Sequence, residues 1–260
     1  RSVIKAPEGY TLIEGDLAQS ELRIAGWIAN DPNILDALYK GIDLHKKTAS
    51  IVTGKPIEKV TKDERDKAKA VNFGYLYGQS AEGFVEYARS EYGIEFKLDQ
   101  AREIRDKFFS YPNGYYRLLN YQEETIRFAR KYGWVEQPLG RRRRLPTITS
   151  SDDFIRGKAE RQAINFRIQA FSSDLALIGL MLFNDRYEND PNTNVVLFIH
   201  DAIIAMCRDE DSELVAKTLK LCMEDLSVSY IKSNFNIVVG YPVVAEIKAG
   251  KSLDRMEVIL

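Results

Sequence analysis

The sequence predicts an α+β fold, with helices through the middle of the chain and one sheet built from strands near its two ends. Residues 10–16 alternate weakly between apolar and polar side chains, which indicates a strand. The apolar runs 195–199 and 202–207 are separated by two polar residues, which is typical of a hairpin. Most of 20–188 carries apolar residues at helical spacing instead. Strands kept apart from a run of helices favour the α+β class.

The composition is that of an ordinary globular protein, with 45% apolar and 29% charged residues. A chain of 260 residues forms one large domain or two small ones. No uninterrupted apolar run of about 18 residues occurs, so no membrane span is expected. With only Cys207 and Cys222, a disulfide scaffold or a cysteine zinc site is not expected, and a reducing compartment is favoured. The net charge of -1 does not indicate a nucleic-acid partner.

The first half of the chain contains several recognisable helix start and stop signals. Helices are predicted at 20–29, 32–41, 43–53, 61–77, 98–110 and 114–132. Pro32 suits a first helical turn, and Gly54 with Pro56 ends the third helix. Thr61 followed three residues later by Glu64 is a capping-box pattern.

The second half alternates between turns and longer elements. Residues 133–150 are rich in glycine and proline, which predicts a loop or hairpin. A long helix with one apolar stripe is predicted at 156–188, followed by a turn at 189–192. After the hairpin, a helix is expected at 212–232 and a closing strand at 238–247.

Two aspartates interrupt segments that are otherwise expected to be buried. Asp16 ends the first strand, and Asp201 lies between the two apolar runs of the hairpin. A buried carboxylate needs a partner, and two converging carboxylates suit a pair of divalent cations. Two Mg²⁺ ions held about 3.5–4 Å apart can activate a hydroxyl and stabilise a leaving oxygen. An aspartate at a strand end is also a common turn or cap residue, and that interpretation stays open.

One face of the 61–77 helix combines cations with aromatic rings. Arg65, Lys69, Phe73 and Tyr77 follow one another at intervals of four residues, so they form one drifting stripe. Cations suit the phosphates of a nucleoside triphosphate, and aromatic rings suit its sugar and base. The cations do not continue in i, i+4 register with acids, so a self-neutralised face fits poorly. A solvated cationic face with core aromatics is the alternative.

A basic cluster follows Gly140, where Arg141 to Arg144 form an unbroken run. Between Arg127 and Arg161 there are ten basic and four acidic side chains, a net charge of +6. A local positive field suits a polyanion such as a phosphate backbone. The alternatives are a solubilising loop or a targeting signal, and the second is disfavoured because Gly140 and Pro146 make the run part of a folded turn.

Together these segments resemble the family A DNA polymerases, the family of bacterial DNA polymerase I and its phage and organelle relatives. Five stretches carry the resemblance in family order over nearly the whole chain: Asp16-Leu-Ala-Gln-Ser-Glu21-Leu-Arg23, Asp43-Leu-His45, Arg65-Asp-Lys-Ala-Lys69-Ala-Val-Asn72-Phe73-Gly74-Tyr-Leu-Tyr77-Gly78, Arg161-Gln-Ala-Ile-Asn165-Phe-Arg-Ile-Gln169 and His200-Asp201.

The resemblance implies a polymerase palm with an antiparallel sheet and an inserted helical fingers subdomain. It places the palm at 1–29 and 161–260 and the fingers at 30–160. The family's thumb and exonuclease-like domain would precede residue 1, so we expect a missing N-terminal portion or a separate chain to complete the enzyme. The implied partners are primer–template DNA and deoxynucleoside triphosphates, and no membrane partner is expected. The implied location is the cytoplasm, either at the nucleoid or, for a viral protein, in the infected host cell.

The same resemblance implies a role for each motif residue. Asp16 and Asp201 would hold two Mg²⁺ ions, with Mn²⁺ as a substitute, and Lys69 is the candidate proton donor to pyrophosphate. The nucleotide would be bound by Arg65, Lys69, His45, Phe73, Tyr77, Glu21 and Gln19. In this set Phe73 packs on the sugar, and Glu21 crowds the 2′ position and selects deoxyribose. The DNA would be bound by Arg161, Asn165, Gln169, His200, Arg141 and Arg142.

The chain departs from the family pattern in ways that leave alternatives open. Ala202 replaces the usual glutamate of the third motif, and Leu17, Ala18 and Ser20 depart from the first. Phe73, where some relatives have tyrosine, suggests rejection of dideoxynucleotides.

Template-directed DNA synthesis is the leading interpretation. A single-subunit RNA polymerase or a reverse transcriptase, and a catalytically impaired DNA-binding polymerase subunit, are the alternatives. Glu21 argues against RNA synthesis, and the retention of both aspartates with Arg65 and Lys69 argues against an impaired subunit.

Overall fold

The computed structural model describes residues 3–260 and divides into two compact units. We call the first the sheet unit, which comprises the chain up to Ser20 together with Phe171–Leu260. The second, the helical unit, is the continuous segment Glu21–Ala170. These units are defined by compactness, and the functional boundaries predicted at 29/30 and 160/161 stay predictions.

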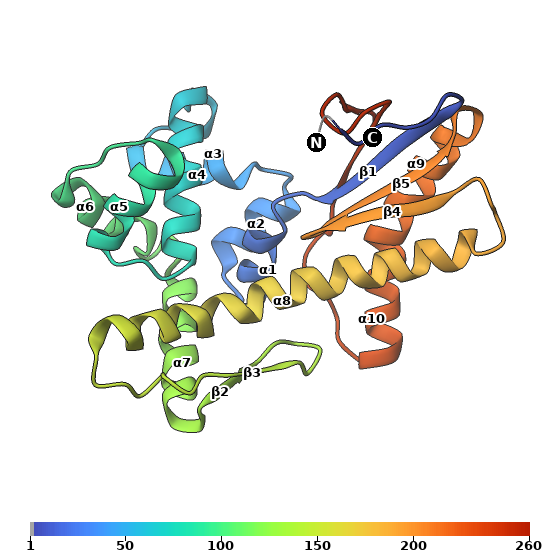
Figure 1. Cartoon of the computed structure of the whole chain (residues 1–260). Helices are drawn as coiled ribbons and strands as arrows, with labels where there is room; N and C mark the ends of the chain where they lie inside the picture. Colours follow the sequence, from blue (N-terminus) through green and yellow to red (C-terminus); the bar gives the residue numbers. More distant parts are fainter. Residues whose placement is uncertain (1–2) are drawn as a thin grey trace. The chain divides into compact units, whose positions relative to one another are not determined.

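The sheet unit contains five antiparallel strands in the order β4-β5-β1-β6-β7. Their bounds are β1 Tyr10–Leu17, β4 Asn194–Ile199, β5 Ala202–Arg208, β6 Ala245–Gly250 and β7 Glu257–Val258. Strands β4, β5 and β1 are labelled in Figure 1. The central strand is β1, which pairs with β5 on one side and with β6 on the other. The α+β class and the antiparallel sheet are therefore confirmed.

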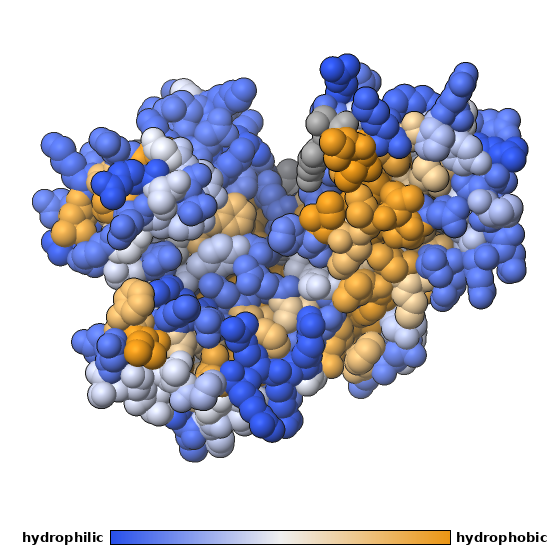
Figure 2. Space-filling view, in the orientation of Figure 1, coloured by the Kyte–Doolittle hydropathy of each residue, from blue (hydrophilic) through white to orange (hydrophobic). Residues whose placement is uncertain are grey.

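The two faces of the sheet differ in what lies against them. On one face, α9 (Ser212–Leu221) packs on β1 and β6 and continues through a π-helical turn, Cys222–Leu226, into α10 (Ser227–Phe235). Gly15 makes room for this helix, because a Cβ there would lie 2.6 Å from the Met223 sulfur. The other face carries an apolar cluster that includes Leu12, Ala202 and Ile204, and apolar surface gathers over the strands in Figure 2.

The helical unit is built from successive short helices and one hairpin. Its elements are α1 Ser20–Ile28, α2 Pro32–Tyr39, α3 Leu44–Thr53, the 3₁₀ turn Ile57–Lys59, α4 Lys62–Leu76, α5 Ala81–Tyr92, α6 Leu98–Phe108, α7 Tyr116–Tyr132, β2 Trp134–Glu136 and β3 Arg142–Arg144. The long helix α8, Asp153–Tyr187, belongs to both units. Aromatic rings form much of this unit's core: Tyr75 lies 4.7 Å from Phe84 and 5.6 Å from Phe108.

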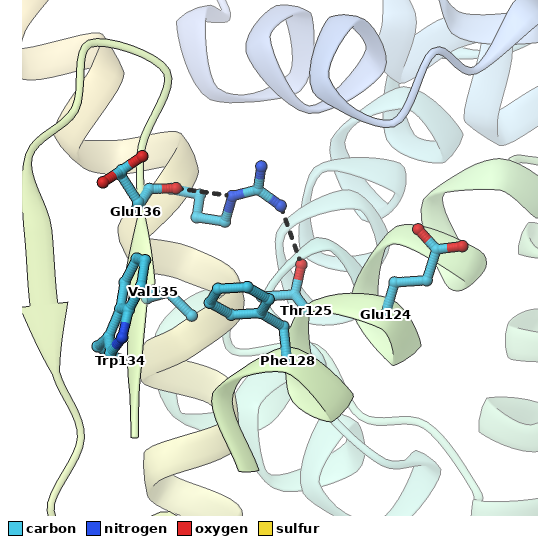
Figure 3. Close-up of a pocket in the computed structure, with 7 residues that line it drawn as sticks. Glu124, Thr125, Phe128, Trp134, Val135 and Glu136 are labelled. Carbon is cyan, nitrogen blue, oxygen red and sulfur yellow. Dashed lines mark hydrogen bonds between the residues drawn. The ribbon is translucent and has the colours of Figure 1, made fainter. Parts of the chain in front are cut away.

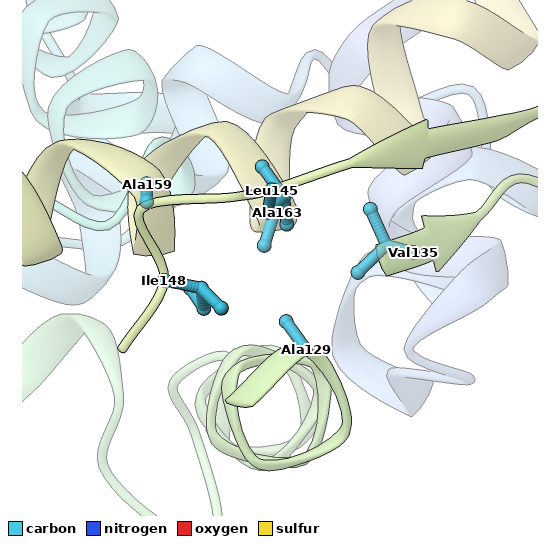
Figure 4. Packing of buried hydrophobic residues seen from close by; sticks show 6 residues of the cluster. All are labelled: Ala129, Val135, Leu145, Ile148, Ala159 and Ala163. Atoms are coloured by element: carbon cyan, nitrogen blue, oxygen red, sulfur yellow. The ribbon is translucent and has the colours of Figure 1, made fainter. Parts of the chain in front are cut away.

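The predicted caps and the predicted hairpin are confirmed. Thr61 accepts a hydrogen bond from the Glu64 amide at 3.2 Å, and Glu64 accepts one from the Thr61 amide at 2.9 Å. Gly54 ends α3 in the left-handed conformation, with φ 74°. Strands β2 and β3 are held on α7 and α8 by one small apolar cluster, made of Ala129, Val135, Leu145, Ile148, Ala159 and Ala163 (Figure 4).

Three predictions about secondary structure were wrong. Helix α5 was missed, although Ser80 caps it, Gly93 ends it and its buried residues Ala81, Phe84 and Ala88 follow at helical spacing. The closing strand begins at Ala245 rather than at 238, and its pairing with β1 starts where Ala245 lies opposite Leu17, the last residue of β1. The helix predicted at 212–232 is interrupted by the π-helical turn.

Helix α8 has the length and composition that a membrane-spanning helix needs. Although no uninterrupted apolar run exists, this helix of 35 residues is long and apolar enough to cross a membrane by length and composition. The core helix of a globular protein meets the same criterion, and Ala163, Ile168, Phe171 and Leu175 of α8 are buried within the fold.

Candidate active site

The two aspartates come together at one end of the central strand pair. In the antiparallel register of β1 and β5, Gly15 lies opposite Ile203, so Asp16 falls opposite Ala202 and next to Asp201. Asp201 occupies the two-residue turn between β4 and β5. Ser20 donates a hydrogen bond to the Asp201 carboxylate at 2.9 Å, and Ser172 donates to Ser20 at 2.9 Å.

Burial and mutual repulsion make this pair electrostatically unfavourable without a cation. Burial, followed by repulsion from Asp201, raises the pKa of Asp16 from 3.8 to about 6. Glu14 and Glu246 raise it further, and Lys248 opposes them. Within residues 3–260, no three acidic, histidine or cysteine side chains converge as a ready-made metal cluster. Two carboxylates with excess negative charge nevertheless fit Mg²⁺, which retains several waters and needs few protein ligands.

Left-handed backbone conformations flank both aspartates. His200 has φ 58° as the first residue of the β4–β5 turn, a position that favours glycine. Gln19, three residues after Asp16, has φ 52°. Residues other than glycine adopt such angles only uncommonly. The exposed His200 and half-buried Gln19 thus lie in the sheet unit beside the acids.

The stripe on α4 is present, but its two cations are paired. Two guanidinium nitrogens of Arg65 donate to one Asp43 oxygen, at 2.7 and 3.2 Å. Lys69 lies 3.3 Å from Asp66. The prediction that a self-neutralised face fits poorly was therefore wrong. Arg65 is paired with Asp43 at the N-cap of α3, 22 residues away, and Lys69 with Asp66, three residues before it on the same helix. Both ion pairs remain partly exposed, so an anionic ligand can still compete for the cations.

The aromatic end of the stripe lies beside Glu21. The rings of Phe73 and Tyr77 are 5.9 Å apart, and the ring of His45 is 6.0 Å from that of Phe73. Tyr77 donates a hydrogen bond to the Glu21 carboxylate, so this carboxylate is held by an aromatic side chain of α4. The helical unit thus brings six of the predicted nucleotide-binding residues together: Glu21, His45, Arg65, Lys69, Phe73 and Tyr77.

His45 is 5% exposed and holds no charge at neutral pH. Burial, together with the positive charges of Arg65 and Lys69, lowers its pKa from 6.5 to about 4, against an opposing effect of Asp43. Any contact that His45 makes to a phosphate is therefore a hydrogen bond from a neutral ring.

This shift predicts a loss of stability in acid. Because the folded pKa is lower than the unfolded one, the unfolded chain binds the proton first, and stability is lost as the pH falls from 6.5 towards 4. Between pH 7 and pH 5 we expect the wild type to lose about 2 kcal/mol more unfolding free energy than His45→Gln. Urea unfolding of both proteins at both pH values measures this difference, and equal losses would contradict it.

The predicted DNA-binding residues of α8 share one face of that helix. Arg161, Asn165 and Gln169 follow at intervals of four residues; Arg161 is half-buried and Gln169 is exposed. The Asn165 side-chain oxygen is buried, and among the described residues it has no hydrogen-bond partner. Since an unpaired buried acceptor is unfavourable, this oxygen is suited to a donor from a ligand.

The arginines of the hairpin are exposed, but two of them make specific contacts. Arg141 donates to the carbonyl oxygen of Ala170 at 2.9 Å. Arg142 forms an ion pair with Glu136, and its guanidinium lies 4.3 Å from the ring centre of Trp134. The hairpin therefore presents an ordered positive surface.

Next to this hairpin lies a cavity of about 360 Å³ that the sequence did not indicate (Figure 3). It is lined by Glu124, Thr125, Phe128, Trp134, Val135, Glu136 and Arg167. Arg167 donates to the Glu136 carbonyl at 3.0 Å and to Thr125 at 3.3 Å, which ties α8 to β2 and α7. The sequence did not indicate that the side chain of Asp43, quoted above only as part of a motif, binds Arg65. It also did not indicate Lys248, whose positive charge acts on Asp16.

Comparisons with known proteins agree with this arrangement. The model of DNA polymerase family A matches residues 1–254. The chain is 33% identical to DNA polymerase I of Pseudomonas aeruginosa over 257 residues, which is 98% of this chain and 26% of that protein. It is 31% identical to the thermostable DNA polymerase I of Thermus aquaticus over 241 residues, 92% of this chain and 28% of that protein.

A solved structure has the same fold over nearly the whole chain. It is the POL domain of Pol1 from M. smegmatis in complex with DNA primer-template and dNTP, with a TM-score of 0.83 and 25% identity over 98% of this chain and 42% of that one. The chain spans about a quarter of the length of the two curated relatives. On the strength of the family match, the chain belongs to DNA polymerase family A.

Proposed function

We propose that this chain forms the catalytic part of a template-directed DNA polymerase, which adds deoxynucleotides to a primer 3′ end. The observation that carries the proposal is the meeting of Asp16 and Asp201 at one end of the sheet, with burial and repulsion that a divalent cation would relieve. Family membership and the POL domain solved with primer-template and dNTP support it.

Each group of residues has a defined task in this proposal. Asp16 and Asp201 would hold two Mg²⁺ ions, which supply a Lewis acid for the attacking and leaving oxygens. Arg65 and Lys69 would exchange their partners Asp43 and Asp66 for the triphosphate, and Lys69 is the proposed proton donor to pyrophosphate. These contacts position the nucleotide and neutralise its charge, which is most of what phosphoryl transfer requires.

The POL domain solved with primer-template and dNTP also supports the proposed partners. Primer–template DNA would lie on the α8 face with Arg161, Asn165 and Gln169 and on the arginine hairpin, while Gln19 and His200 serve the nucleotide and the primer terminus. The curated relatives are longer, which supports a further N-terminal portion, or a separate chain, that grips the duplex. For such an enzyme we propose a cytoplasmic location.

Primer extension tests the function directly. The chain is incubated with a labelled DNA primer–template, Mg²⁺ and all four dNTPs, and extension to the template end is expected; EDTA abolishes it. DNA binding without extension would favour the impaired subunit suggested by Ala202. An RNA template in the same assay separates reverse transcription from DNA-directed synthesis.

Sugar selection depends on Glu21. Shortening this side chain removes the group that crowds the 2′ position, so Glu21→Ala is expected to raise ribonucleotide incorporation relative to deoxyribonucleotide by at least about tenfold. The measurement compares kcat/KM for one rNTP and its dNTP. Tyr77→Phe is the control, because it removes the hydrogen bond to Glu21 and leaves the carboxylate in place. If Glu21→Ala left the ratio unchanged, the steric role would be refuted.

A further inference from the structure

Four buried polar side chains form a continuous hydrogen-bonded chain that ends at His45. Tyr115, at the start of α7, lies 2.9 Å from the hydroxyl of Thr48 on α3. Thr48 donates to the side-chain oxygen of Asn72 on α4 at 2.7 Å. The Asn72 nitrogen is 2.9 Å from Nδ1 of His45. The four residues are between 0% and 5% exposed, so water does not replace these contacts.

The direction of the hydrogen bonds follows from the number of protons available. Thr48 has one hydroxyl proton, which goes to the Asn72 oxygen, so Tyr115 must donate to Thr48. In the opposite direction the Tyr115 proton would need another acceptor, and the described part of the chain offers this hydroxyl no partner except Thr48. The Asn72 amide therefore donates to Nδ1, and the ring proton of His45 lies on Nε2.

We propose that Asn72, held in orientation by Thr48 and Tyr115, is a positioning residue that keeps His45 neutral with its proton on Nε2. In this form His45 donates a hydrogen bond to a phosphate of the incoming nucleotide, with a strength that does not vary near neutral pH. The inference rests on the proposed polymerase function, because it names the role of a buried network in nucleotide binding.

The surroundings of His45 favour this state over an imidazolium. The charged groups that face it are Asp43 at the start of its own helix and Arg65, Asp66 and Lys69 on α4; α7 contributes only the neutral Tyr115. Arg65 and Lys69 already supply positive charge. A third cation, buried beside them, would add repulsion, and a proton on Nδ1 would remove the acceptor that Asn72 needs.

Nitrogen NMR of the two histidine rings tests the tautomer without any activity measurement. The chain has only two histidines, so His45→Gln identifies the signals of His45. In the wild type we expect an unprotonated Nδ1 and a protonated Nε2 from pH 8 down to pH 5. In Asn72→Asp, which is nearly isosteric but accepts rather than donates, we expect the proton on Nδ1. A wild-type ring protonated on Nδ1, or an Asn72→Asp ring like the wild type, would overturn the proposal.

Nucleotide kinetics then test the consequence. Asn72→Asp and Thr48→Val are expected to raise the KM for dNTP about tenfold while kcat changes little, because an interaction made equally in the ground and transition states is weakened. Tyr115→Phe, the mildest change, is expected to give a mixture of tautomers and a smaller rise in KM. If Asn72→Asp fails to fold, Tyr115→Phe provides the same test of the positioning role.

Tyr121→Phe is the matched control. It also removes a buried tyrosine hydroxyl, one that donates to the Ile164 carbonyl at 2.9 Å, but it lies outside the chain that ends at His45. We expect this variant to keep the wild-type tautomer and KM. A wild type that does not extend primers would refute the proposed function and leave the NMR result standing. Extension with unchanged KM in both Asn72→Asp and Thr48→Val would refute the positioning role alone.

Discussion

Asp201→Asn is expected to lower the single-turnover rate of primer extension by about a thousandfold or more, which corresponds to about 4 kcal/mol of transition-state stabilisation. The substitution preserves the size of the side chain, and the asparagine oxygen can still accept the hydrogen bond from Ser20. It removes one of the two negative charges proposed to hold the metal ions. The same loss is expected for Asp16→Asn.

Two further measurements make this result specific. Asp185→Asn makes the same charge change at an exposed position of α8 and is expected to leave the rate unaltered. Binding of Mn²⁺, followed by electron paramagnetic resonance, is expected to weaken in Asp201→Asn and not in Asp185→Asn. Rapid extension by Asp201→Asn, with undiminished Mn²⁺ binding, would show that this carboxylate is not a metal ligand.

Phe84→Ala is expected to destabilise the helical unit by about 3–5 kcal/mol, because it opens a cavity in a core that cannot fully collapse. Phe84 is 0% exposed; its ring lies 4.7 Å from that of Tyr75 and 5.1 Å from that of Phe96. Thermal and denaturant unfolding measure the change. Phe154→Ala deletes the same side chain where it is 77% exposed, and we expect only a small effect there. Equal effects of the two substitutions would contradict the assigned core.

Local sequence signals were sufficient for some elements and not for others. The start of α4 was predicted because a capping box depends on residues three apart in the chain. The hairpin of β4 and β5 followed from two apolar runs around a short polar turn. Helix α5 was missed, although Ser80 and Gly93 mark its ends and Ala81, Phe84 and Ala88 follow at helical spacing, so these local signals were present in the sequence. Phe84 is a buried core residue, and its ring packs against Tyr75 of α4 and Phe96 of the segment between α5 and α6.

The candidate site was predicted as a set of residues but not as a set of contacts. The motifs around Asp16, Arg65 and Asp201 were sufficient to indicate the family, which the family model then showed. They did not indicate that Asp43 pairs with Arg65, or that Lys248 faces Asp16. Both partners are distant in sequence, and no local pattern relates their positions.

The order of residues along the chain was enough for the helix caps, the strand periodicity and the chemistry available in each motif, because these depend on neighbours within about one or two helical turns. Only the tertiary structure determines which of these distant side chains contact one another. Asp16 meets Asp201 through the register of β1 and β5. The neutral state of His45 follows from its burial, and Thr48 and Tyr115 orient the Asn72 side chain that contacts its Nδ1. Charge, burial and hydrogen-bond direction at a site are properties of long-range packing, and they are set when distant elements come into contact.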